Sequence, residues 1–250
     1  MNRGIYTSAS GMVSETVRTD TIANNLANCN TVGYKKDINI TKDFQSMLIE
    51  RINDGEDPPP KIGRMGTGSV AIENYVVHQT GSFVDTGNPL DVAINGKGYF
   101  TIETPNGVRY TRNGSFVLNA NMELTTSDGY PVQGVGGARI LLLNADAINI
   151  SQDGNVYNGD QLIGQLNMVD FGETRALHKE GQLMFRADDG ANVQPFTGKI
   201  VQGMLEASNV NVIEEMVNLI ASYRAFEINA KGVQTHDQLN DKAVNEVSRL

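Results

Sequence analysis

Both ends of this chain carry the same spacing of apolar and small side chains, and this feature limits its fold more than any other. The spacing alternates between three and four residues, a period of about 3.5 that is typical of helices packed in pairs or bundles. A helix unbroken from residue 212 to 247 would be about 50 Å long, which is ordinary for a coiled coil. The stripes are Ile5, Ala9, Met12, Thr16, Thr19, Ala23 and Leu26, and Val212, Met216, Leu219, Tyr223, Phe226, Ala230 and Val233.

Local signals predict where these helices begin and end. Gly33 is the expected stop of the first helix, because glycine ends a helix without steric cost. Ser208 or Asn209 is the expected cap of the second. Glu214 and Glu215 then lie near its positive end, where acidic side chains are favourable.

Amides occupy helical positions that usually carry charged side chains. Asparagine is a poor helix former, because its side chain competes for backbone hydrogen bonds. We interpret these amides as neutral groups that set the register of packed helices, since a charge would have to be desolvated at every contact. The residues concerned are Asn24, Asn25, Asn28, Asn209, Asn211 and Asn218.

Between the two ends the period drops to two and turn dipeptides multiply, which predicts an antiparallel β domain. The expected turns are Asn95-Gly96, Asn106-Gly107, Asn113-Gly114, Asp128-Gly129, Asp153-Gly154, Asn158-Gly159 and Asp189-Gly190. Short apolar runs separate them, at residues 90–94, 99–102, 140–143 and 162–169.

The predicted fold class is α+β, with long N- and C-terminal helices forming a coiled-coil-like pair and a central turn-rich β domain. We expect a discontinuous terminal-helix domain at residues 1–35 and 205–250, and a β domain at residues 80–189. Residues 36–79 and 190–204 would be extended connections, with Pro58–Pro60 as a semi-rigid spacer. The alternative is an intramolecular helical hairpin packed on the β domain. Self-assembly is favoured because two narrow stripes alone leave much apolar surface uncovered.

Composition argues against several kinds of partner. The net charge of −9 disfavours nucleic acid and anionic membranes, both of which need clustered Lys and Arg. No apolar run approaches the roughly 18 residues of a membrane span. The start MNRGIYTSASGM lacks the apolar core of a signal peptide. We therefore expect the protein to stay in the cytoplasm or to use another export route.

No set of side chains predicts catalysis, a cofactor or a metal. His78, His178 and His236 are far apart in the sequence and belong to no ligand motif. Cys29 is expected to be a small buried apolar group. Four carboxylates of the β domain could supply the pair that glycoside hydrolysis needs, but the sequence does not show how far apart they lie. They are Asp85, Asp91, Glu103 and Asp128.

Several strings resemble the flagellar basal-body rod and hook protein family, and together they touch both ends and the centre of the chain. YTSASGM (6–12) and TIANNLANCNTVGYKK (21–36) are similar to its N-terminal signature, and ASNVNVIEEMVNLIASYRAFEINAK (207–231) to its C-terminal one. Within the β region the matching strings are GNPLDVAINGKGYF (87–100), YTRNGSFVLN (110–119) and SDGYPVQG (127–134). Cys29 departs from the family pattern, which more often has a small or β-branched apolar residue there.

This resemblance implies a structural rod subunit of the bacterial flagellar basal body, proximal or distal. In that family the terminal helices form the inner tube and the β domain lies outside. Subunits leave through the flagellar type III export apparatus without a cleaved signal, into the basal body that spans the periplasm. Implied partners are copies of the chain, neighbouring rod and hook proteins, the export apparatus and outer ring (bushing) proteins, with no nucleic acid and no membrane insertion.

We predict head-to-tail polymerisation through the terminal helices into a tubular shaft that transmits torque. Three alternatives stay open: a hook-type axial protein, a cell-wall glycan-binding β protein, disfavoured by the absence of Trp, and a coiled-coil scaffold outside the flagellum. The predicted assembly residues are Ile5, Met12, Ile22, Asn24, Asn25, Leu26, Asn28, Val212, Met216, Leu219, Tyr223 and Phe226.

Overall fold

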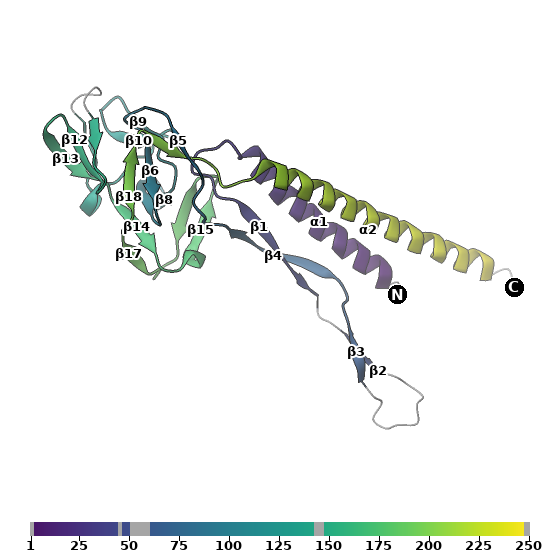
Figure 1. The fold of residues 1–250 in the computed structure, drawn as a ribbon. Helices are drawn as coiled ribbons and strands as arrows, with labels where there is room; N and C mark the ends of the chain where they lie inside the picture. The colour runs from purple at the N-terminus through teal and green to yellow at the C-terminus, as the bar shows by residue number, and fades with distance from the viewer. Residues whose placement is uncertain (1–2, 45–46, 51–60, 143–147, 248–250) are drawn as a thin grey trace. The chain divides into compact units, whose positions relative to one another are not determined.

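The computed structural model describes residues 3–44, 47–50, 61–142 and 148–247 (Figure 1). The chain forms two compact units. Unit 1 is drawn from residues 1–27, 37–75 and 211–250, and unit 2 from residues 28–36 and 76–210. The predicted Pro58–Pro60 spacer lies outside the described residues.

Unit 1 contains two long helices that lie side by side, α1 (Arg3–Ala27) and α2 (Val212–Val247) (Figure 1). The unbroken second helix from residue 212 to 247 is confirmed. The predicted stop of the first helix at Gly33 is wrong, because α1 ends at Ala27. Beyond it the backbone N–H and the hydroxyl of Thr31 donate to the backbone oxygen (3.1 Å) and the side-chain oxygen (3.2 Å) of Asn28, forming a turn in place of a further helical turn.

The cap of α2 also differs from the prediction. The Asn211 side-chain oxygen accepts from the N–H groups of Ile213 (3.1 Å) and Glu214 (3.4 Å), so Asn211 is the N-cap in place of Ser208 or Asn209. Asn209 is engaged elsewhere, since its side-chain oxygen accepts from the Lys36 N–H at 2.8 Å. Ser208, Asn209 and Asn211 could each cap the helix by residue type. The contacts of Asn209 with Lys36 leave Asn211 as the cap.

Two further strand pairs follow α1 in the chain. β1 (Asp37–Asp43) pairs with β4 (Ser69–Val76), and β2 (Met47–Glu50) pairs antiparallel with β3 (Lys61–Met65). The segment 36–79, expected as an extended connection, is thus extended in its described part and paired with itself.

Unit 2 is an antiparallel β structure, as predicted for the centre of the chain. Its largest sheet has six strands in the order β15 (Leu177–Glu180), β16 (Met184–Ala187), β8 (Gly107–Thr111), β7 (Tyr99–Thr104), β14 (Met168–Phe171) and β17 (Val193–Pro195). A three-stranded sheet joins β11 (Ile148–Ile150), β12 (Asn155–Asn158) and β13 (Gln161–Gln165). The remaining pairs are β9 (Phe116–Leu118) with β10 (Leu124–Thr126), β18 (Lys199–Gln202) with β6 (Val92–Asn95), and β19 (Met204–Glu206) with β5 (Phe83–Asp85). Two 3-10 turns lie at Val135–Gly137 and Thr174–Ala176.

The turn prediction is confirmed at six of the seven dipeptides and is wrong at Asn113-Gly114, where the backbone runs on without a turn. The glycine of every predicted dipeptide except Gly114 has a positive φ, which favours glycine. Gly114 is needed for space, because an added Cβ would lie 1.6 Å from the Val92 carbonyl oxygen. The turns bring the apolar runs together in two buried clusters. The larger includes Val92, Ile94, Phe100, Ile102, Phe116, Leu124, Leu166 and Ile200, and the smaller consists of Val76, Tyr99, Phe171, Leu177 and Phe185.

Candidate assembly surface

Small and polar side chains form the contact between α1 and α2, which we call the helix seam. Ser222 donates to a carboxylate oxygen of Glu15 at 2.6 Å, and its hydroxyl lies 3.0 Å from that of Thr19. Nearer the start of α2, the Asn25 amide donates to the Glu215 carboxylate at 3.3 Å. Asn25, Glu215 and Ser222 are each only 1% exposed, so the seam excludes water although it is polar.

Glycines bring the other half of the seam together. An added Cβ would lie 2.1 Å from His236 Nε2 at Gly4, 2.8 Å from the Asn229 amide nitrogen at Gly11, and 2.9 Å from the Ser8 hydroxyl at Gly232. The residues of α1 contact residues of α2 with steadily lower numbers as the chain proceeds along α1. The two helices therefore run antiparallel. The helix seam therefore depends on close approach of the two helix backbones. Packing of the apolar stripes as a coiled coil stays a prediction.

The predicted assembly residues are distributed over several environments. Ile22, Asn25 and Asn28 are buried. Asn25 makes its hydrogen bonds inside the subunit, donating to the Asp37 carbonyl at 2.7 Å and accepting from its N–H at 2.9 Å. Asn24, Met216 and Tyr223 are exposed, and the others are half-buried, namely Ile5, Met12, Leu26, Val212, Leu219 and Phe226.

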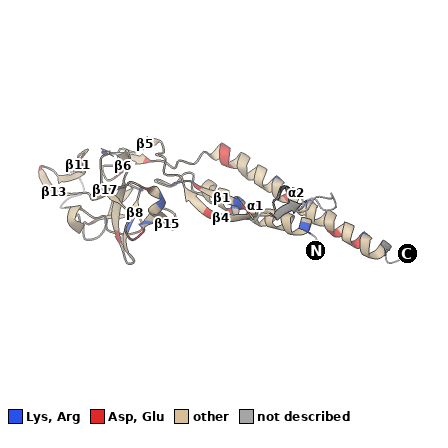
Figure 2. Cartoon of the chain, turned by 90° about the horizontal axis from the view of Figure 1, so that it is seen from below, with Lys and Arg blue, Asp and Glu red and all other residues tan. Residues whose placement is uncertain are grey.

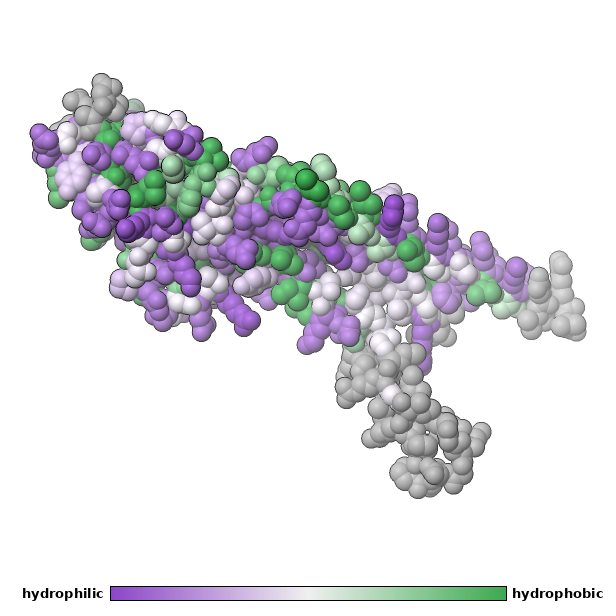
Figure 3. Space-filling model, in the orientation of Figure 1, coloured by the Kyte–Doolittle hydropathy of each residue, from purple (hydrophilic) through white to green (hydrophobic). Residues whose placement is uncertain are grey.

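An apolar surface remains exposed on α2, on residues turned away from the seam. We define the outer face of α2 as Ile213, Met216, Val217, Ile220, Tyr223 and Ile228, which are between 49% and 76% exposed. Figure 3 shows hydrophobic patches along the helices, and no charged residue occurs from Met216 to Tyr223 (Figure 2). Ile213 and Ile220 are residues beside the main stripe that the sequence predicts other subunits to cover, whereas Val217 and Ile228 were not singled out. The three-and-four spacing of Ile213, Val217 and Ile220, next to the stripe, was the signal that could have found Val217.

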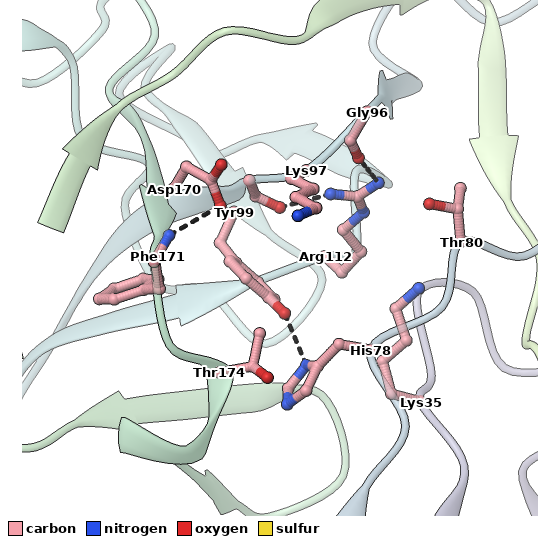
Figure 4. Close-up of a pocket in the computed structure, with 12 residues that line it drawn as sticks. Lys35, His78, Thr80, Gly96, Lys97, Tyr99, Arg112, Asp170, Phe171 and Thr174 are labelled. Carbon is pink, nitrogen blue, oxygen red and sulfur yellow. Dashed lines mark hydrogen bonds between the residues drawn. The ribbon is translucent and has the colours of Figure 1, made fainter. Parts of the chain in front are cut away.

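Unit 2 holds a cavity of about 290 Å³ whose lining includes Lys35, His78, Tyr99, Arg112 and Asp170 (Figure 4). Both buried cations are engaged by Glu206: Lys35 Nζ lies 2.5 Å from one carboxylate oxygen and Arg112 Nε lies 2.5 Å from the other. Burial lowers the pKa of Lys35, while the Glu206 carboxylate acts against this lowering. The sequence analysis missed this cluster, because its members are far apart in the chain.

Two other polar residues singled out in the sequence, His178 and Asp91, have local partners. His178 Nε2 lies 3.0 Å from Asp188, and Asp91 accepts hydrogen bonds from Thr86 and Asn88 in a turn. Cys29 is half-buried. Among the described residues, no three His, Cys, Asp or Glu side chains gather where they could hold a metal ion. In the same part of the chain, neither helix is both long and apolar enough to cross a membrane.

His78 makes the stability of unit 2 sensitive to acid. Burial, with Lys35 and Lys179 nearby, lowers the pKa of His78 from 6.5 to about 4, and Nδ1 lies 2.6 Å from the Tyr99 hydroxyl. Because the unfolded chain takes up this proton near pH 6.5, the free energy of unfolding should fall as the pH drops from 6.5 to about 4, by about 2 kcal/mol after allowing for partial solvent exposure.

Urea unfolding of the chain between pH 6.5 and about 4 measures this loss of stability. We expect His78→Gln to flatten the slope and the exposed control His178→Gln to leave it unchanged, whereas parallel curves for His78→Gln and the unmodified chain would contradict the assignment.

Comparisons with known proteins place family signatures at both ends and in the centre of the chain. Residues 5–35 match the family described as "Flagella basal body rod protein", residues 93–158 the "Flagellar hook protein FlgE/F/G D1 domain", and residues 201–246 the "Flagellar basal body rod FlgEFG protein C-terminal". The flagellar basal-body rod protein FlgG of Bacillus subtilis (strain 168) is 36% identical over 265 residues, covering 98% of this chain and 99% of that protein. The protein FlgF of Caulobacter vibrioides is 32% identical over 252 residues and 100% of both chains, and FlgF of Rhizobium meliloti is 34% identical over 98% of this chain and 97% of its own length.

Proposed function

The chain belongs to the flagellar basal-body rod protein family, and on that premise we propose that it polymerises head-to-tail through its terminal helices into a tubular shaft that transmits torque. Membership itself makes it a structural rod subunit of the flagellar basal body, built to assemble with other rod and hook components. Relatives named FlgG and relatives named FlgF both match nearly the whole chain. The proposal holds for either position in the rod.

The observation that carries this proposal is the outer face of α2. The helix seam leaves these side chains uncovered, and burying each of them would contribute roughly 1.5–3 kcal/mol. An exposed apolar patch of this kind on a soluble protein marks an interaction surface. Covering the outer face with other subunits would therefore add apolar burial that the helix seam does not provide.

The end of α2 supports a contact that does not close on itself. Gly4 of α1 lies against His236, and in the part of the chain that the structure describes α1 begins at Arg3. α2 continues from His236 to Val247, with Leu239 and Val244 57% and 68% exposed. A surface at one end of the pair would then meet a different surface of the next copy, which builds a filament.

The finer features of this proposal follow from the family and from the sequence. The helices within residues 1–35 and 205–250 form the inner tube, residues 80–189 the outer β domain, and residues 36–79 and 190–204 the connections between them. The chain works without catalysis or a cofactor. It is exported by the flagellar type III apparatus and contacts copies of itself, adjacent rod and hook proteins and the surrounding ring. The predicted assembly residues keep their roles in this scheme, with the outer face of α2 added to them.

Removing α2 beyond His236 tests the head-to-tail contact. A strain lacking this gene is supplied with the full chain or with a chain ending at His236. We expect the shortened chain to keep its helix seam and to be exported, and yet to yield no rod beyond the preceding component, because the continuing part of α2 is missing. Electron microscopy of isolated basal bodies measures rod length. Rods of full length built from the shortened chain would contradict the contact, and Gln238→Ala serves as a control at an exposed position of the same segment.

A further inference from the structure

Three segments of unit 2 meet in one hydrogen-bonded cluster, which we call the junction clamp. They are residues 33–36, 77–81 and 206–209. Unit 2 comprises residues 28–36 and 76–210, so each segment adjoins a point where the chain passes between the units. Three of the four covalent connections of unit 2 to the rest of the chain, those next to residues 36, 76 and 210, therefore begin at this cluster, and the fourth enters at Asn28.

Glu206 is the centre of the junction clamp, and it is 1% exposed. Its carboxylate pairs with Lys35 and Arg112 and accepts from the Gly81 N–H at 2.9 Å. Its backbone oxygen accepts from the Gly33 N–H at 2.8 Å. Lys35 in turn donates to the Gln79 carbonyl at 2.7 Å, so one carboxylate joins all three segments.

Asn209 joins the same three segments a second time. Its side-chain oxygen accepts from the Lys36 N–H at 2.8 Å, and its side-chain nitrogen donates to the carbonyls of Val77 (2.8 Å) and Gln79 (3.2 Å). The Val77 N–H donates to the Lys36 carbonyl at 2.8 Å, which closes the ring of contacts. The side-chain amide of Asn209 thus links the three segments with hydrogen bonds of the kind that backbone groups form between adjacent strands.

The junction clamp is also anchored in the body of unit 2. Besides Glu206, the Arg112 guanidinium donates to the carbonyls of Ile94, Gly96 and Gly98 at 2.5–2.9 Å. Lys179 donates to the Lys35 carbonyl at 2.9 Å and lies over the Tyr34 ring, 3.8 Å from its centroid. Figure 4 shows Lys35 and Arg112 approaching from different elements.

We propose that the junction clamp is a mechanical coupling, in which Glu206 and Asn209 are positioning residues that make three of the four chain connections of unit 2 share force as one. The inference rests on the proposed function of the chain as a torque-transmitting subunit. Separate connections would be loaded one at a time, and a pull on one would peel a terminal strand from its sheet. When the clamp holds the three segments together, a force on any of them is passed to the whole of unit 2.

Hydrogen exchange on the purified full chain tests whether the clamp is one unit. In Asn209→Ala we expect the amides of Gly33, Lys36, Val77 and Gly81 to exchange together, about tenfold faster than in the unmodified chain. The six-stranded sheet should keep its protection, and the exposed control Asn192→Ala should change none of these amides. Faster exchange at Lys36 alone would overturn the proposal, since only that amide donates directly to the removed side chain.

Swimming under load tests the mechanical role. In a strain lacking this gene, the Asn209→Ala chain should build rods of normal length and support normal speed in dilute buffer, with a clear loss of speed or broken rods in viscous medium. Full-length rods with unchanged speed at every viscosity would overturn the coupling while leaving polymerisation intact. Absent rods would also count against it, because the proposal places the clamp outside the assembly contacts.

Discussion

Replacing Ile220 by aspartate is expected to abolish rod assembly while leaving the subunit folded. Ile220 is 55% exposed on the outer face of α2, so a carboxylate there stays hydrated in the free subunit. In the rod it would have to be desolvated at every copy, which costs several kcal/mol and adds to the roughly 1.5–3 kcal/mol of lost apolar burial. Such a penalty lowers the association constant between neighbouring subunits by more than about a hundredfold.

Three measurements separate this result from simple misfolding. Circular dichroism of the purified chain should match that of the unmodified protein, and the variant should still be exported. Basal bodies should lack the segment that this subunit builds. The control Gln234→Asp places the same carboxylate at an exposed position of α2 outside the outer face, and should support swimming. Normal motility with Ile220→Asp would show that this face is not an assembly surface.

Replacing Glu206 by alanine should give the largest loss of stability in unit 2. The change leaves Lys35 and Arg112, 1% and 4% exposed, without their counter-charge. Breaking a buried ion pair in this way destabilises by roughly 3–5 kcal/mol, which lowers the melting temperature of a unit of this size by about 10 °C. Calorimetry of the full chain measures the shift.

The matched control for this variant is Glu180→Ala. Glu180 also lies 2.5 Å from a guanidinium, that of Arg109, but its side chain is 42% exposed. The Arg109 side chain is 10% exposed, but water reaches the Glu180 carboxylate and weakens the pair, so the control should lower the melting temperature less than Glu206→Ala does. Equal shifts for the two variants would mean that burial of the Glu206 cluster adds nothing to its strength.

The sequence predicted the features that depend on neighbouring residues. The length of α2 followed from a spacing that runs from Val212 to Val233, is interrupted at Asp237 and Asn240, and resumes at Val244 and Val247. The turns of unit 2 followed from Asn-Gly and Asp-Gly pairs, whose glycines adopt positive φ for local steric reasons. Both signals need only a short window of sequence, and both were confirmed except at Asn113-Gly114.

Features that depend on distant residues were missed. Nothing local distinguishes Gly4 as a contact point, because its role exists only opposite His236. Of the polar side chains in the helix seam, Thr19 belonged to the predicted stripe, but its partner Ser222 did not. Glu206 likewise has an ordinary neighbourhood in the sequence, and its partners Lys35 and Arg112 are brought to it only by the fold.

The separation of the helix seam from the outer face of α2 has a consequence for how such subunits diverge. The residues that hold α1 to α2 and those available to neighbours lie on different sides of α2, and distant, independent sites change stability almost additively. Substitutions such as Val217→Leu can therefore alter which copies recognise one another without loosening the subunit. A duplicated gene could acquire a new place in the same axis by changing one side of one helix.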